Sequence, residues 1–166
     1  SEKVQNRILE LMIKLNLNKE DRQIVKPALE KSEKEKTNVV AIKLQDGRVI
    51  TGKESKLLSA SSAMLINTLK ELSNIPDEEY LLSPEILEGI FKTKQRISYR
   101  KNYCLNIQEV LIALSICSNM NPIIEKTLKN LDELHGAEAH ATYIVEKSEI
   151  NVLKSLGINL TCEAKL

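Results

Sequence analysis

The segment from Ala137 to Val145 places an acid and a base where they could act together. Residues two apart in a β-strand project from the same face, so Glu138 would lie beside His140. A carboxylate in that position can orient the imidazole for acid–base chemistry, and Cys162, in a following strand, could add a nucleophile. The structural alternative is that the Glu-x-His pair faces solvent or satisfies polar groups of the core, with Cys162 as a small buried apolar residue.

A second candidate site lies where a lysine leads into a serine-rich helix start. Helix N-termini attract anions through their free N–H groups and the helix dipole. Lys53, Ser59 and Ser61, together with Lys56, could therefore hold a phosphate or a carboxylate. The structural alternative is that the serines cap the helix and that small residues let it pack closely against a sheet.

Two more familiar kinds of site are not supported. Residues 47–53 have the glycine and lysine spacing of a nucleotide-binding P-loop, but Glu54 stands where a serine or threonine would bind magnesium. His135 and His140 are five residues apart and lack the third and fourth ligands that a metal site needs. We therefore expect no metal site, and the sequence does not indicate a cofactor.

The overall composition narrows the class of partner. Lysine and arginine number 24 against 23 acidic residues, so no net field favours nucleic acid or an anionic membrane. The apolar runs are too short to cross a bilayer. Three cysteines without a Cys-x-x-Cys pair favour a reducing compartment, and we expect a cytoplasmic protein.

The elements that must position these residues can be inferred from periodicity. Asp46-Gly47 between two β-rich runs indicates a hairpin. Five strands are expected, at residues 39–44, 49–51, 80–82, 137–145 and 158–162. Helices are expected to start near residues 55–59, 84, 106, 121 and 148, with a capping box at Asn106 and Glu109 and with Ser148 as the cap of the last helix. The sequence thus predicts an α/β fold: a mixed sheet of about five strands with a β-hairpin, packed with four to five helices.

The first residues have a different character. A helical apolar pattern begins at once, without an initiator methionine, and is followed by a charged run at residues 31–36. We expect residues 1–36 to form a helical arm or inter-domain linker and residues 37–166 to form the C-terminal α/β domain of a longer protein.

Several segments together resemble one bacterial family. They are residues 46–60, 75–77, 81–84, 109–117, 138–140 and 156–163. Over essentially its whole length the chain resembles the C-terminal part of the bacterial uncharacterised protein family 0371, also called domain of unknown function 1846. The resemblance implies a longer protein with an N-terminal portion, and it implies no particular reaction. It also implies that the candidate residues lie in recognisable motifs, namely Lys53, Ser59, Glu138, His140, Cys162 and Glu163.

Two functional hypotheses follow, and the sequence leaves open whether the protein is an enzyme. In the first, this domain adds an anion or small-molecule site to a cytoplasmic bacterial enzyme, at the edge shared with its N-terminal domain. In the second, it is a non-catalytic oligomerisation or scaffold domain. We also expect a homo-oligomer. Convergence of the candidate residues on one pocket would favour the first hypothesis.

Overall fold

The computed structural model describes residues 2–18, 21–97 and 102–163. Seven α-helices, a 3-10 helix and four strands occur in these ranges. The helices are α1 (Glu2–Lys14), α2 (Val25–Glu35), α3 (Ala60–Leu72), α4 (Pro84–Ile97), α5 (Ile107–Ser118), α6 (Pro122–Leu128), the 3-10 helix η2 (Lys129–Leu134) and α7 (Lys147–Ser155). The strands are β1 (Val39–Lys43), β2 (Val49–Lys53), β3 (Glu138–Ala141) and β4 (Asn159–Cys162).

The four strands form one mixed sheet in the order β2-β1-β3-β4. β1 pairs antiparallel with both β2 and β3, and β3 pairs parallel with β4 through the crossover helix α7. The β1–β2 hairpin turns at the predicted Asp46-Gly47 pair, where Gly47 has a φ of +91°. The expected α/β class and mixed sheet are therefore confirmed.

The expected count of five strands was one too high. Residues 80–82 form a loop between α3 and α4, in which Leu81 and Leu82 are buried by packing and not by strand pairing. A short apolar run does not distinguish these two environments. β3 is also shorter than the predicted strand 137–145, because its partner β1 begins at Val39. The helix count differs slightly too, since residues 129–134 form the separate helix η2.

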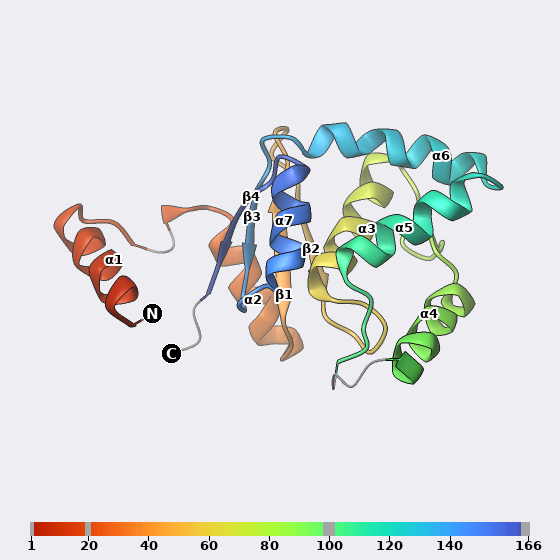
Figure 1. The fold of residues 1–166 in the computed structure, drawn as a ribbon. Coiled ribbons are helices and arrows are strands. Elements are labelled where there is room, and N and C mark those ends of the chain that lie inside the picture. The colour runs from red at the N-terminus through yellow and green to blue at the C-terminus, as the bar shows by residue number, and fades with distance from the viewer. Residues whose placement is uncertain (1, 19–20, 98–101, 164–166) are drawn as a thin grey trace.

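The two faces of the sheet are covered by different helices (Figure 1). On one face, Val40 and Ile42 of β1 belong to the main hydrophobic core, to which α3, α5 and α7 contribute. On the other face, Ala41 packs against Ile24 and Ala28 as α2 crosses β1. Residues that alternate along β3 and β4 therefore face two different environments.

Gly52 is the point at which α3 meets the sheet. A Cβ atom at this position would lie 1.9 Å from the backbone nitrogen of Met64. Only glycine allows this approach, so the second glycine of the P-loop-like segment has a packing role.

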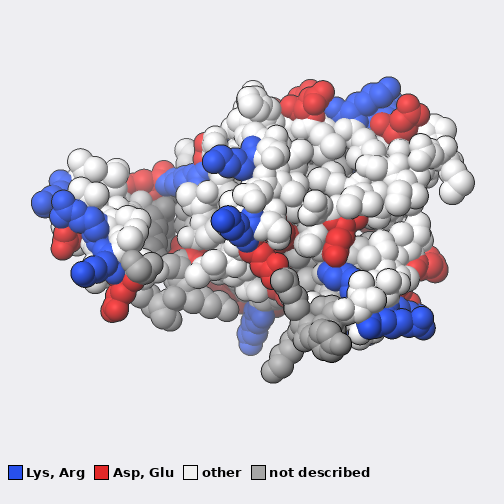
Figure 2. Space-filling view, in the orientation of Figure 1, with Lys and Arg blue, Asp and Glu red and all other residues white. Residues whose placement is uncertain are grey.

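The two N-terminal helices behave differently. α2 packs against the sheet, whereas α1 has no buried residue and stands apart, beyond β4 (Figure 1). The division at residue 36 between an arm and a domain stays a prediction about the longer protein. None of the helices in the described ranges is long and apolar enough to cross a membrane. On the face shown in Figure 2, basic and acidic side chains are interspersed.

Candidate functional site

A cavity of about 890 Å³ opens where three helices begin at one end of the sheet. Ser59 and Asn106, the N-cap residues of α3 and α5, line it, as does Glu149 from the first turn of α7. Asn38 and Glu54 contribute from the adjacent ends of β1 and β2. Helix N-termini present N–H donors, so the cavity wall carries several polar groups fixed by backbone geometry.

Glu149 is the most deeply buried carboxyl group of the cavity wall. Its side chain is only 4% exposed. Oε1 accepts hydrogen bonds from Ser59 Oγ at 2.6 Å and from the backbone nitrogen of Ile107 at 3.0 Å. Removal from water raises the pKa of Glu149 above its ordinary value of 4.5, although these two hydrogen bonds act in the opposite direction. Burial therefore favours the neutral carboxyl group.

Ser59 links Glu149 to a second serine of α3. Ser59 Oγ lies 2.9 Å from Ser62 Oγ, and Ser62 Oγ donates to the carbonyl of Leu105 at 2.9 Å. If Glu149 is ionised, the single hydroxyl proton of Ser59 must serve the carboxylate and cannot also serve Ser62. Ser59 Oγ also accepts from the backbone nitrogen of Ser62 at 3.1 Å.

Two more groups of the cavity wall are shifted toward their neutral forms. Burial raises the pKa of Tyr143, whose hydroxyl lies 3.3 Å from Ser61 Oγ. Burial also raises the pKa of the Cys104 thiol. Tyr143, Cys104 and Glu149 all line the same cavity. In each of the three groups, burial favours the uncharged form, which can donate a hydrogen bond.

The rim of the cavity is braced by an ion pair. Lys94 Nζ donates to Glu109 Oε2 at 2.7 Å and to the carbonyl of Cys104 at 2.6 Å. Glu109 also completes the capping box with Asn106 that the sequence predicts. Of the cavity-lining residues that the structure describes, four are acidic (Glu54, Glu109, Glu146 and Glu149) and one, Lys94, is basic.

The residues predicted to bind an anion are only partly brought together. Ser59 caps α3 at the cavity, and Ser61 lies beside Tyr143. Lys53 Nζ instead donates to Glu35 Oε2 at 2.7 Å and helps to lower the pKa of Glu35 to about 2. Lys56 Nζ lies over the ring of Phe91. The two lysines are thus engaged elsewhere, and an anion-binding role for this set stays a prediction.

Glu138 and His140 lie side by side, as predicted, but on the other side of the sheet from the cavity. Arg22 pairs with Glu138 and Thr161, and it donates to the carbonyls of Ala139 at 3.2 Å and Asn159 at 2.6 Å. Burial lowers the pKa of Arg22. We call Arg22, Glu138, His140, Thr161 and Glu163 the Arg22 network.

His140 occupies the buried part of this network. It is 3% exposed, with Nδ1 at 2.8 Å from Thr161 Oγ1 and Nε2 at 3.3 Å from Glu163 Oε1. Both ring nitrogens face protein groups across the β3–β4 pair. The arrangement fixes the ring and holds two parallel strands together.

Cys162 does not lie with His140. It is opposite Ala141 in the β3–β4 register and packs against the main core, on the face away from His140. The three residues predicted for catalysis thus divide between two faces, and their catalytic role stays a prediction. The structure also shows no cluster of three or more His, Cys, Asp or Glu that could hold a metal ion in the described ranges.

Comparison with known proteins gives one consistent relationship. Residues 20–166 match the family described as domain of unknown function DUF1846, C-terminal. The chain belongs to this family. It is 42% identical to a UPF0371 protein of Clostridium botulinum strain Eklund 17B and 40% identical to one of Clostridium tetani, in each case over 92% of this chain and 32% of the relative. A UPF0371 protein of Clostridioides difficile is 39% identical, over 95% of this chain and 33% of the relative.

The chain therefore spans about a third of the length of these curated relatives. The predicted family resemblance is confirmed, and the family model that matches describes a C-terminal domain. α1 lies outside the region that the DUF1846 C-terminal description covers.

The sequence analysis did not predict Glu149, the most deeply buried carboxyl group of the cavity wall. The sequence suggests Ser148 as the cap of the last helix, but α7 begins at Lys147 after Glu146, and Glu149 falls in its first turn. An acidic residue in the first turn of a helix was the available signal. Tyr143 and Cys104 had no such signal: Tyr143 falls in the predicted strand 137–145, and Cys104 stands in a loop.

Proposed function

We propose that this domain contributes a small-molecule site to the longer protein, and that the site is the cavity around Glu149. One observation carries the proposal: three groups whose pKa burial raises, Glu149, Tyr143 and Cys104, open on a single cavity. Groups of this kind that share a cleft are characteristic of binding and catalytic sites, whereas isolated ones often serve the fold.

The wall of the cavity indicates the chemistry of the ligand. The described part of the wall holds Glu54, Glu109, Glu146 and Glu149 beside Lys94, and these carboxyl groups would suit an amine or several hydroxyl groups. The Tyr143 hydroxyl and the Ser59–Glu149 pair would supply orienting hydrogen bonds. We therefore propose a small amine or polyol in place of the anion that the sequence suggests.

Within an enzyme, Glu149 would be the group that transfers a proton. A carboxyl group with a raised pKa holds its proton to a higher pH, so it can donate that proton and take it back later in a reaction cycle. Ser59 is positioned 2.6 Å away to relay or orient that proton. The reacting partner would enter from the open side of the cavity, where the longer protein could supply further groups.

The test is a binding measurement on the wild type and on Glu149→Gln. Spermidine, glucosamine, glycerol and inorganic phosphate would each be titrated while backbone amide shifts are followed by NMR. We expect spermidine or glucosamine to shift the amides around Ser59 and Ile107, and Glu149→Gln to weaken that response. Glu138→Gln makes the same chemical change on the other side of the sheet and should leave binding unchanged.

A response to phosphate alone would contradict the proposed ligand class. No response to any of the four probes, or an equal response in Glu149→Gln, would count against the site itself. In that case the non-catalytic scaffold role becomes the better proposal. One feature favours that alternative independently: the exposed apolar surface of α1.

A further inference from the structure

α1 exposes many apolar side chains to water, which is unfavourable for a helix that has no partner. None of its residues is buried. Ile13 is 78% exposed and Leu15, just past the helix, is 66% exposed. The other large apolar residues exposed in this region are Val4, Ile8, Leu9, Leu11 and Leu17. Several exposed apolar side chains gathered on one helix mark a contact with another domain or protein.

The width of this apolar surface indicates whether it contacts a single helix or a groove in a folded domain. At 3.6 residues per turn, the apolar positions from Leu11 round to Ile13 span roughly 200° of the helix circumference. A two-helix contact needs only a narrow stripe, whereas a wide apolar arc is typical of a helix buried on several sides. The surface therefore fits a groove in a folded domain better than it fits one helix of a second copy.

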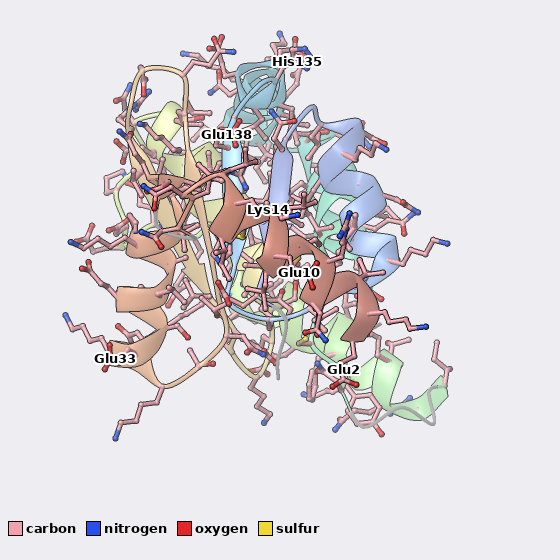
Figure 3. The ribbon with its side chains drawn as sticks, turned by 90° about the vertical axis from the view of Figure 1, so that its left-hand side faces the viewer. Glu2, Glu10, Lys14, Glu33, His135 and Glu138 are labelled. Carbon is pink, nitrogen blue, oxygen red and sulfur yellow. The ribbon has the colours of Figure 1, made fainter. Side chains whose placement is uncertain are left out.

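The surroundings of α1 agree with a domain contact. Figure 3 views the molecule from the α1 side, with Glu10 and Lys14 of α1 in front and Glu138 of β3 on the sheet. α1 lies beyond β4, and β4 is the edge strand of the sheet. Arg22, in the segment that connects α1 to α2, is fixed to β3 and β4 by its contacts with Glu138 and Asn159. The chain therefore leaves the sheet at a firmly held point.

The length of the relatives indicates which protein segment could cover the apolar surface of α1. α1 lies outside residues 20–166, which match the C-terminal domain of the family, and the curated relatives are about three times as long as the matched part. We propose that α1 docks into the portion of the longer protein that precedes this domain. The helix then acts as a hydrophobic anchor that sets the position of the C-terminal domain relative to that portion.

Site-specific photo-crosslinking in the full-length protein tests the inference. p-Benzoylphenylalanine would replace Ile8 within the apolar arc, and in a matched variant it would replace Glu10 on the polar side of α1. We expect position 8 to give a crosslink to the preceding portion within a single chain, with the mass of a monomer. Position 10 should lose that product. Cooperative thermal unfolding of both variants would show that they are folded.

Two outcomes would overturn the inference. One is a crosslink from position 8 that doubles the mass, which would place a second copy on α1. The other is equal yield from positions 8 and 10, which would mean that the apolar arc has no specific partner. A Leu11→Lys change should abolish the crosslink from position 8, while Ile116→Lys, at an exposed apolar position of α5, should not.

Discussion

The two sides of the sheet hold buried polar residues for different purposes. In the Arg22 network, one guanidinium group contacts Glu138, Thr161 and two backbone carbonyls, and His140 lies between Thr161 and Glu163. In the cavity, Glu149 and Tyr143 are desolvated strongly enough to raise their pKa, yet they still line a space that a ligand can enter. Burial of a polar residue alone therefore does not identify a functional site, and the site that we propose rests on burial beside an open cavity.

The largest effect on stability is expected when Arg22 is removed from its network. Arg22→Ala removes the guanidinium donor of Glu138 and of two strand carbonyls, and because this pair is partly exposed we expect it to lower the free energy of unfolding by about 1 to 2 kcal/mol. Urea unfolding measures this change. Binding at the cavity should be unaffected.

Arg7→Ala is the matched control. Arg7 on α1 is 66% exposed and pairs with the exposed Glu10 three residues later, so its loss should cost less than about 0.5 kcal/mol. If the two substitutions had equal effects, the Arg22 network would have no special role in stability.

A smaller effect is expected in the cavity, where Glu149 should make stability depend on pH. The pKa of Glu149 is raised in the folded state, so its contribution to stability is fully present below its ordinary value of 4.5 and is lost as the pH rises through the raised value. Relative to Glu149→Gln, the wild type should therefore lose stability as the pH increases above about 4.5. Thermal unfolding across a pH series measures this difference.

Glu88→Gln, on the exposed side of α4, controls for the loss of one carboxylate, and its stability curve should run parallel to that of the wild type. A constant difference between wild type and Glu149→Gln at every pH would show that Glu149 is not desolvated in solution.

The smallest effect concerns reactivity and leaves stability unchanged. Because burial raises the pKa of Cys104, less thiolate is present at pH 8 and iodoacetamide should modify this cysteine more slowly than free cysteine. Peptide mass spectrometry would follow the rate, with Cys104→Ser confirming the assignment. Protection by a bound amine or polyol would place that ligand in the cavity, and modification as fast as that of free cysteine would contradict the desolvated environment.

Local patterns predicted the parts of the fold that depend on neighbouring residues. The Asp46-Gly47 turn and the Asn106–Glu109 capping box both form as expected. The predicted strand 137–145 failed beyond Ala141, because the length of a strand also depends on where its partner begins. The predicted strand at residues 80–82 failed because the main core, to which Leu81 and Leu82 belong, also buries loops.

The candidate site residues were also predicted only in part. The adjacency of Glu138 and His140 followed from the two-residue repeat of a strand, and the structure shows it. The position of Cys162 relative to His140 depended on the register between two strands. A register shift of one residue would exchange the two faces, and the alternation along β4 places Cys162 with Leu160 on the core face.

The sequence by itself determined the α/β class, the hairpin, several helix starts and the family, because each of these depends on residue order over short spans. Only the tertiary structure decided that Ser59 and Glu149, 90 residues apart, share a hydrogen bond at one cavity. Desolvation and through-space contact set the protonation of Glu149, and both arise only when distant segments pack together.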